Sequence, residues 1–462
     1  MLLGDVFDQF VQGSPASVMV RALLENVLQP GPLDELFERT ATIQYSDRLL
    51  FSNVVEVMGL VVTGFFKSPH AVYQRHPELF PVSLKCFYEK LQGIELSVMQ
   101  AMVRDSAARM QAIVNEWEGG QPPLLPGYRV KILDGNALAG SEHRIKELRG
   151  LAAGALPGKT LGVLDPQLGL IIDVFPCEDG HAQERALLGE VLATVQAGDL
   201  WIEDRNFCTL GFICGVAARG AAILVREHQG LPWAAETELR YVGRTPTGAV
   251  WEQEITIEVE SEEDQKQLGT KRLKLRRLLI KLDKPTRDNE TEVVLLTNVY
   301  DKDALVLAQL YLERWRIETA FQVLTVTLNC EQSRLGYPHA ALFSFCVTVV
   351  AYNLLATVKA ALGSVHGSET VEEKVSVYHL TEDVKRTHAG MMIAISMPHW
   401  LILRDLSAKE MAKLLRELAA KVKLAIYKKA ASKEKKPPPP RHSDPKHPHV
   451  STAKILAERS RK

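Results

Sequence analysis

The order of short apolar runs between Tyr128 and Glu227 limits the fold more than any other feature of the sequence. Runs of aliphatic residues bounded by Gly, Pro or Asp predict strands, and a three-to-four period predicts helices. The predicted order is strand, hairpin, helix, strand, helix and strand, from "YRVKILDG", "TLGVLD" with "GLIIDVF", "AQERALLGEVLATVQ", "LWIED", "FCTLGFICGVAARG" and "AAILVRE". This order predicts an α/β core.

The regions on either side of this core have different patterns. Helical periodicity dominates up to about residue 120, and the breaker cluster Gly119–Tyr128 is a predicted boundary. After Glu227 strict alternation dominates, as in "EITIEVE", which predicts a β-rich insertion. The predicted regions are a helical N-terminal region (1–120), the first part of the core (121–226), the insertion (227–290), the second part of the core (291–362), a helical C-terminal region (363–430) and a basic, Pro-rich, disordered tail (431–462).

Charge is unevenly distributed, although the net charge of the whole chain is −1. The segment from Lys421 to Lys462 has 13 Lys and Arg against three acidic residues, and Lys271–Arg287 has eight against Asp283 alone. Basic blocks of this kind can bind phosphate backbones. A solubilising tail and a solvated strand edge explain them equally well.

The six cysteines are scattered without a C-x-x-C pair, which argues against a zinc ribbon and fits a reducing cytoplasm. The first ten residues have no signal-peptide pattern. The apolar stretch Ala341–Val358 is long enough to span a membrane, but Ser, Thr and Asn interrupt it. We therefore expect a buried core helix, a cytoplasmic location and no membrane partner.

Three carboxylates are the candidate catalytic residues. Asp134 and Asp204 follow predicted strands, and Glu318 lies on a helix face with Tyr311 and Arg314 in "YLERWRIETAFQ". Converging carboxylates suit Mg²⁺, and two such ions can cleave a phosphodiester. Each residue also has an ordinary structural explanation, because a strand-end Asp commonly caps a turn and a polar helix face is commonly solvated.

Taken together and in this order, "ILDGNAL", "GDLWIEDRNF" and "YLERWRIETAFQ" resemble the DDE transposases of insertion sequences, in particular the insertion sequence four group with its Y-R-E-K signature. The resemblance covers roughly residues 128–362. It implies a ribonuclease H-like mixed sheet with a β-strand insertion between the second Asp and the Glu. The interval from Asp204 to Glu318 leaves room for the insertion that the alternation predicts.

Residue by residue, the resemblance implies that Asp134, Asp204 and Glu318 hold Mg²⁺ or Mn²⁺, with two ions expected. Tyr311 and Arg314 would contact DNA phosphates, and Arg226 is a weaker candidate for the same role. Arg suits this because its planar fork binds phosphate with two hydrogen bonds.

Two positions depart from the family pattern. Thr325 stands where the family has Lys, and Gln322 stands where many relatives carry Lys. Arg316 is expected to point to another side of the helix than Arg314. One contact to a DNA strand is therefore in doubt, whereas the metal site does not need this Lys.

Other aromatic residues have structural explanations first. We expect Trp315, Ile317, Ala320 and Phe321 to form the packed side of the helix. Trp233 and Trp251 in the insertion could stack on an unpaired base, but core packing is the simpler expectation.

The expected function is that of a bacterial transposase that cleaves the ends of its own element and joins them to target DNA. The expected partners are double-stranded DNA and a second copy of the chain on paired ends. The alternatives are another ribonuclease H-like nuclease, such as a resolvase or repair nuclease, and a transposase-derived protein that binds DNA without cleaving it.

Overall fold

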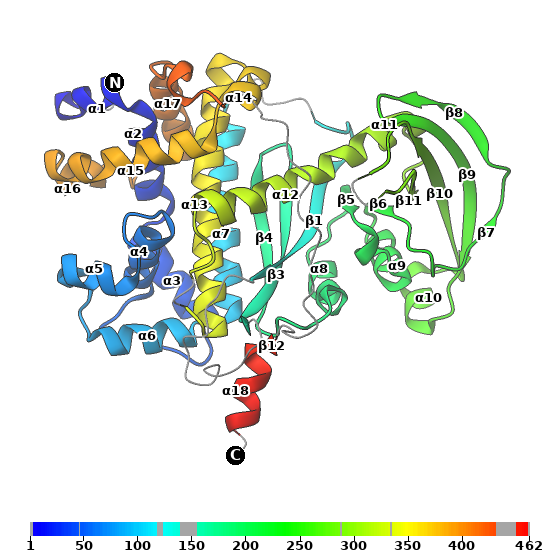
Figure 1. The fold of residues 1–462 in the computed structure, drawn as a ribbon, viewed down its shortest axis with the longest axis horizontal. Coiled ribbons are helices and arrows are strands. Elements are labelled where there is room, and N and C mark those ends of the chain that lie inside the picture. The colour runs from blue at the N-terminus through cyan, green and yellow to red at the C-terminus, as the bar shows by residue number, and fades with distance from the viewer. Residues whose placement is uncertain are drawn as a thin grey trace.

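The computed structural model describes residues 3–45, 47–117, 123–138, 155–286, 289–332, 335–430 and 450–460. One mixed sheet runs through the molecule (Figure 1). The helical part lies at the end of the sheet near β4 (Leu170–Cys177), and strands β7 to β10 (within residues 234–282) form its opposite end. Residues 119–122 of the predicted boundary, Arg287, and residues 431–449 and 461–462 of the predicted tail lie outside the described residues.

Five strands form the core of the sheet in the order β4-β3-β1-β5-β6. Their bounds are β1 Arg129–Leu138, β3 Gly158–Asp165, β4 Leu170–Cys177, β5 Asp199–Glu203 and β6 Ala222–Arg226. Strands β1, β5 and β6 are parallel, whereas β3 runs antiparallel to β1 and β4 antiparallel to β3. This mixed sheet is the ribonuclease H-like core that the resemblance implies.

The connections follow from local sequence. Strands β3 and β4 form the predicted hairpin, in which Asp165 pairs with Leu170 and Gly169 has a positive φ of 72° that suits glycine. Parallel strands need crossovers, and these are α8 (Leu188–Leu192) before β5 and α9 (Leu210–Ala218) before β6. The helix before β5 is shorter than predicted and is preceded by the 3-10 turn Glu184–Leu187.

The insertion extends the same sheet. Its elements are β7 Ala234–Ala235, β8 Arg240–Thr245, β9 Gly248–Glu258, α10 Glu262–Leu268 and β10 Arg272–Leu282, followed by β11 Glu292–Thr297. Strand β11 pairs antiparallel with both β6 and β10, so the insertion is anchored to the edge of the core. As the alternation predicts, Ile255 and Ile257 are fully buried and Glu258 is exposed.

Helices from both ends of the chain make up the helical part. They are α1 Asp8–Gly13, α2 Pro15–Val27, α3 Pro30–Thr40, α4 Phe51–Val62, α5 Pro69–Arg75, α6 Leu84–Gly93, α7 Leu96–Asn115, α13 Pro338–His366, α14 Ser368–Lys374, α15 Val377–Ala394, α16 Met397–Leu401 and α17 Ala408–Ala419. Figure 1 shows α7 and α13 side by side next to β4, and both helices pack on that strand. One hydrophobic core therefore joins the helical part to the sheet.

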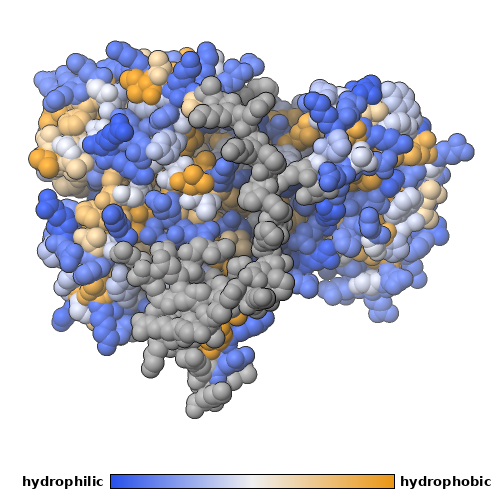
Figure 2. Space-filling model, in the orientation of Figure 1, coloured by the Kyte–Doolittle hydropathy of each residue, from blue (hydrophilic) through white to orange (hydrophobic). Residues whose placement is uncertain are grey.

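Helix α13 is long and apolar enough to cross a membrane, but 83% of its most apolar window is buried in the protein. Its polar residues are satisfied inside: Asn353 accepts a hydrogen bond from the Ile171 amide (2.9 Å) and donates one to the Ile171 carbonyl (2.8 Å). These bonds fasten the helix to β4. Figure 2 shows a mostly hydrophilic surface with separate hydrophobic patches, in keeping with the core position of this helix.

The C-terminal segment differs from the predicted disorder. Strand β12 (Val450–Ser451) pairs with β2 (Ala155–Leu156), and α18 (Thr452–Ser460) follows it. Ile455 and Leu456 are partly buried in the same small hydrophobic cluster as Tyr337, and Nζ of Lys454 lies 3.1 Å from Oδ2 of Asp179. The prediction used the composition of the whole tail, which is basic and Pro-rich, and so overlooked the short apolar face of α18.

Candidate functional site

The two aspartates lie on neighbouring parallel strands. Leu133 pairs with Glu203, so Asp134 and Asp204 occupy the next positions along β1 and β5. Neighbouring strands are roughly 4.8 Å apart. Strand β5 ends at Glu203, whereas β1 continues to Leu138 because it still pairs with β3. Asp134 is therefore inside its strand and not at its end, but it lies where the pairing with β5 stops.

The helix that carries Glu318 crosses the sheet above Asp134. The predicted single helix is divided into α11 (Ala304–Leu310), a 3-10 turn at Tyr311–Arg314 and α12 (Trp315–Gln322). Gly162 pairs with Asp134, and an added Cβ on Gly162 would lie 3.1 Å from the Cζ atom of Phe321. The missing side chain at Gly162 thus lets α12 approach the sheet closely.

Arg314 connects the carboxylates of the strand and the helix. Its Nη1 atom donates to Oδ2 of Asp134 at 3.2 Å, and its Nη2 lies 2.8 Å from Oε1 of Glu318. The side chain of Arg314 is 11% exposed, whereas that of Glu318 is 38% exposed, so the guanidinium is largely buried and the Glu318 carboxylate still meets solvent. Arg314, the predicted phosphate-binding residue, therefore contacts two of the three candidate carboxylates, Asp134 and Glu318.

Burial and the proximity of the carboxylates shift the pKa values of Asp134 and Arg314. Burial raises the pKa of Asp134 to about 6; the Gly135 amide and Arg314 oppose this, while Glu318 and Asp204 add to it by repulsion. Burial works against the charge of Arg314, but Tyr311 and the three carboxylates outweigh it and raise its pKa. Asp204 and Glu318 therefore both act on Asp134, and all three carboxylates act on the same arginine.

Tyr311 is buried at the same place. Burial raises the pKa of its hydroxyl, and Arg314, Asp204, Arg226 and Asp134 all act on it electrostatically. Among the described residues, neither the Tyr311 hydroxyl nor Nε of Arg314 has a hydrogen-bond partner. Buried polar atoms are normally bonded, so these two donors are available to a bound group.

The donor set suits a hard cation. Asp134, Asp204 and Glu318 offer only carboxylate oxygens, the ligands that Mg²⁺ and Mn²⁺ prefer. In the part of the chain that the structure describes, no three acidic, His or Cys side chains are arranged to hold an ion as they stand. In this arrangement the guanidinium of Arg314 is bound to two of the three carboxylates, Asp134 and Glu318.

Arg226, the weaker phosphate candidate, ends β6 near this cluster. Its Nη2 lies 2.5 Å from Oε2 of Glu290, whose other oxygen lies 3.0 Å from Arg205. Glu290 therefore already neutralises much of the charge that Arg226 could offer to a phosphate. The role of Arg226 in DNA contact stays a prediction.

The helix continues beyond α12 in a wider turn. Val323–Thr327 form a π turn, a feature frequent at functional sites. Thr325 is exposed, and its hydroxyl donates to the Phe321 carbonyl at 2.5 Å. As expected, Arg316 points elsewhere: its Nη1 donates to the Pro166 carbonyl at 3.0 Å.

The prediction that Trp315 belongs to the packed side of the helix is wrong. Ile317, Ala320 and Phe321 are buried, but the Trp315 side chain is 57% exposed. Trp315 is three residues before Glu318, so the two share a side of the helix. The ring also lies 5.3 Å from the Arg314 guanidinium. Trp315 therefore belongs to the rim of the site.

The aromatic residues of the insertion are tied to charged neighbours. Trp233 donates to Oε1 of Glu227 at 2.7 Å and lies 4.8 Å from Arg277. Trp251 contacts Tyr241 with a centroid separation of 5.4 Å and lies beneath Lys281. Packing within the insertion explains both rings.

The basic run in β10 is largely neutralised within the sheet. Its ion pairs join Arg272 to Glu258, Arg276 to Glu252, Arg277 to Glu227 and Lys281 to Glu292. Cross-strand pairs of this kind stabilise a sheet. This arrangement favours the structural explanation of the run over a phosphate-binding one.

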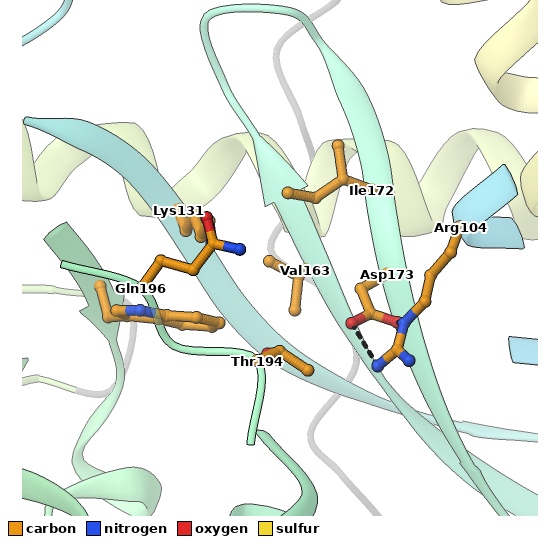
Figure 3. Close-up of a pocket in the computed structure, with 8 residues that line it drawn as sticks. Arg104, Lys131, Val163, Ile172, Asp173, Thr194 and Gln196 are labelled. Atoms are coloured by element: carbon orange, nitrogen blue, oxygen red, sulfur yellow. Dashed lines mark hydrogen bonds and ion pairs between the residues drawn. The ribbon is translucent and has the colours of Figure 1, made fainter. Parts of the chain in front are cut away.

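A cavity of about 320 Å³ lies elsewhere (Figure 3), lined by Arg104, Lys131, Val163, Ile172, Asp173, Thr194, Gln196 and Trp201. Lys131 and Trp201 are three residues before Asp134 and Asp204, roughly 10 Å away along the strands. Figure 3 shows Arg104 bonded to Asp173, and Lys131 lies 2.6 Å from Asp199. Its cations are therefore already paired, and we do not assign the chemistry to this cavity.

The sequence did not single out two acidic residues near the aspartates. Glu203 is fully buried, and its carboxylate has no hydrogen-bond partner among the described residues. Burial raises its pKa well above the usual value. Glu184 lies against Gly135 and bonds to Asn206. No spacing motif links Glu184 to Asp134, because their proximity arises only in the fold.

Residues 127–354 match the sequence family described as "Transposase DDE domain". The chain is also similar to a putative transposase, y4zB, of Sinorhizobium fredii, with 25% identity over 185 residues that cover 40% of this chain. The chain spans about half of that relative, since the match covers 48% of its length.

Among solved structures, the chain is similar to piggyBac transposase in a cryo-EM structure of its synaptic complex with hairpin DNA. The match has 12% identity and a TM-score of 0.41, and covers 83% of this chain and 82% of that chain. The residues that match this family, 127–354, include Asp134, Asp204 and Glu318.

Proposed function

We propose that this protein is a metal-dependent transposase that cleaves DNA at the ends of its own element and joins them to target DNA. The observation that carries the proposal is that β1, β5 and α12 bring Asp134, Asp204 and Glu318 to one place. The match of this region to the transposase DDE domain supports the same reading.

Each residue has a chemical role in this proposal. Asp134, Asp204 and Glu318 would hold one or two Mg²⁺ or Mn²⁺ ions. Such ions activate a nucleophilic oxygen and stabilise the leaving oxygen of a phosphodiester. Arg314 binds a DNA phosphate through its guanidinium fork, and the Tyr311 hydroxyl donates to the same group. Water attacks the phosphorus at the element end, and the bond from phosphorus to the 3′-oxygen breaks, which leaves a 3′-hydroxyl and a 5′-phosphate. The 3′-hydroxyl then attacks a phosphorus of the target strand, and the target's own 3′-oxygen leaves as a hydroxyl.

The remaining assignments rest on resemblance. The N-terminal helices would recognise the terminal repeats of a bacterial insertion sequence, and two copies of the chain would hold paired ends. A cytoplasmic location follows from this role. These assignments require DNA binding by the whole chain, which a terminal-repeat binding measurement tests.

The deciding experiment compares wild type, Glu318→Gln and Glu313→Gln in DNA nicking and strand-transfer assays with Mg²⁺. Glu318→Gln removes a proposed metal ligand, whereas the matched control Glu313 pairs with Arg316 outside the cluster. We expect only Glu318→Gln to abolish both reactions while DNA binding is kept. Equal activity of wild type and Glu318→Gln would refute the three-carboxylate mechanism.

The same experiment separates the alternatives. Cleavage without strand transfer would favour another ribonuclease H-like nuclease. DNA binding without activity in any variant would favour a binding protein derived from a transposase, an alternative to which Thr325 gives some support.

A further inference from the structure

Glu184 lies on the opposite side of β1 from Asp134. It begins the 3-10 turn before α8, and its carboxylate occupies the position that a side chain at residue 135 would fill. Successive residues of a strand point to opposite faces. Because Asp134 faces α12, Glu184 is outside the cluster of three carboxylates and is not placed to hold the same ion.

The same carboxylate holds the loop after Asp204. Asn206 donates from Nδ2 to Oε2 of Glu184, and the neighbouring Arg185 donates from Nε to the Asn206 carbonyl at 2.6 Å. Both the side chain and the backbone of Asn206 are therefore bound to the segment that precedes α8.

The loop is also held from its other side. Arg205 lies 3.0 Å from Glu290, which in turn binds Arg226 at the end of β6. The buried Phe207 donates its amide to the Asp204 carbonyl at 3.0 Å. The backbone next to Asp204 is thus fixed between β1, β6 and the core.

We propose that Glu184 is a positioning residue, which sets the place of Asp204 through Asn206 and ties that loop to β1 by lying against Gly135. This inference rests on the proposed function, because it concerns how the metal-binding carboxylates are aligned. A metal site needs its ligands held in place by such neighbouring bonds.

Gly135 allows the contact to be broken without changing Glu184. An added methyl at residue 135 would overlap the far end of a flexible side chain, which can rotate away at little cost. Gly135→Ala therefore displaces the carboxylate from Asn206, and it should have the same effect as Glu184→Ala.

The test is Mn²⁺ binding to the full-length protein, followed by electron paramagnetic resonance and calorimetry. The variants are Glu184→Ala, Glu184→Gln, Gly135→Ala and their Ala double variant, with the exposed Glu190→Ala on α8 as the matched control. We expect Glu184→Ala and Gly135→Ala each to weaken Mn²⁺ binding about fivefold, the loss of one hydrogen bond. Glu184→Gln still accepts from Asn206 and should bind like wild type.

Two further comparisons make the result specific. The double variant should be no weaker than either single variant, and Glu184→Ala should have no further effect in an Asp204→Ala background. If Glu184→Ala and Gly135→Ala both bind Mn²⁺ like wild type while Asp204→Ala does not, the inference is wrong and the metal site stands. If wild type and Asp204→Ala bind Mn²⁺ equally, the proposed metal site itself falls, and the inference with it.

Discussion

The Nη2 nitrogen of Arg314 lies 2.8 Å from Oε1 of Glu318, one turn further along the chain. The same guanidinium reaches Asp134 at 3.2 Å. One cationic side chain thus joins the strand and the helix that are proposed to hold the metal. A DNA phosphate would compete with these carboxylates for the guanidinium, and a metal ion would compete with the guanidinium for the carboxylates.

Arg314→Ala should separate these two roles. Without the guanidinium, Asp134 and Glu318 lose a competing cation, so Mn²⁺ binding to the protein without DNA should tighten by up to about fivefold. DNA binding and cleavage should weaken, because the phosphate loses its fork. Calorimetry with Mn²⁺ and a DNA-binding titration measure the two effects.

Arg314→Lys is the matched control, since Lys keeps the charge but not the planar fork. It should leave Mn²⁺ binding near the wild-type value and still weaken DNA binding. Unchanged Mn²⁺ affinity in Arg314→Ala would show that the guanidinium and the metal do not share these oxygens.

Gly162→Val should move α12 away from the sheet. The added side chain would press against Phe321, which the glycine now admits at close range. Overpacking of this kind costs about 1–3 kcal/mol, and the displacement carries Glu318 away from Asp134. Urea unfolding and Mn²⁺ binding should both report the change.

The second variant Gly162→Val/Phe321→Leu provides the check. A smaller residue at position 321 makes room for the valine, so Mn²⁺ binding should recover in part. If the pair behaves as the sum of two independent losses, the close approach of α12 at Gly162 does not set the site.

The succession of strands and helices along the core was predictable because each strand has its own apolar run, bounded by turn residues. The position of Asp134 beside Asp204 comes from the parallel pairing of β1 with β5, which the apolar runs alone do not specify. The exposed side of Trp315 and the contact of Glu184 with Gly135 were not predictable in the same way. Both depend on how α12 and the segment before α8 approach the sheet, and local periodicity does not encode that distance.

Stability should fall in mild acid because of His388. Burial, together with the nearby charges of Arg21 and His76, lowers the pKa of this imidazole to about 4, and Phe65 stacks on the ring with a centroid separation of 4.1 Å. Below its usual pKa of about 6.5, the unfolded chain binds a proton that the folded protein excludes. The free energy of unfolding therefore decreases as the pH falls from about 6.5 towards 4.

His388→Phe keeps the aromatic contact and removes the titration. Urea unfolding of both proteins across this pH range should show a shallower loss of stability in the variant. Parallel curves for wild type and His388→Phe would mean that other groups cause the acid sensitivity.

Thr325→Lys should strengthen DNA binding. Thr325 is exposed and lies in the π turn that continues α12, so a lysine there adds a cation without disturbing the core. One new phosphate contact should steepen the dependence of log affinity on log salt by about one unit. The metal ligands are untouched, so Mn²⁺ affinity should not change.

The matched control is Val326→Lys, because Val326 is adjacent and 70% exposed but is rotated around the turn. A gain in DNA affinity for Thr325→Lys alone would place this face of the turn against DNA. Equal gains for both variants would reflect net charge only, and no gain for either would put the DNA path elsewhere.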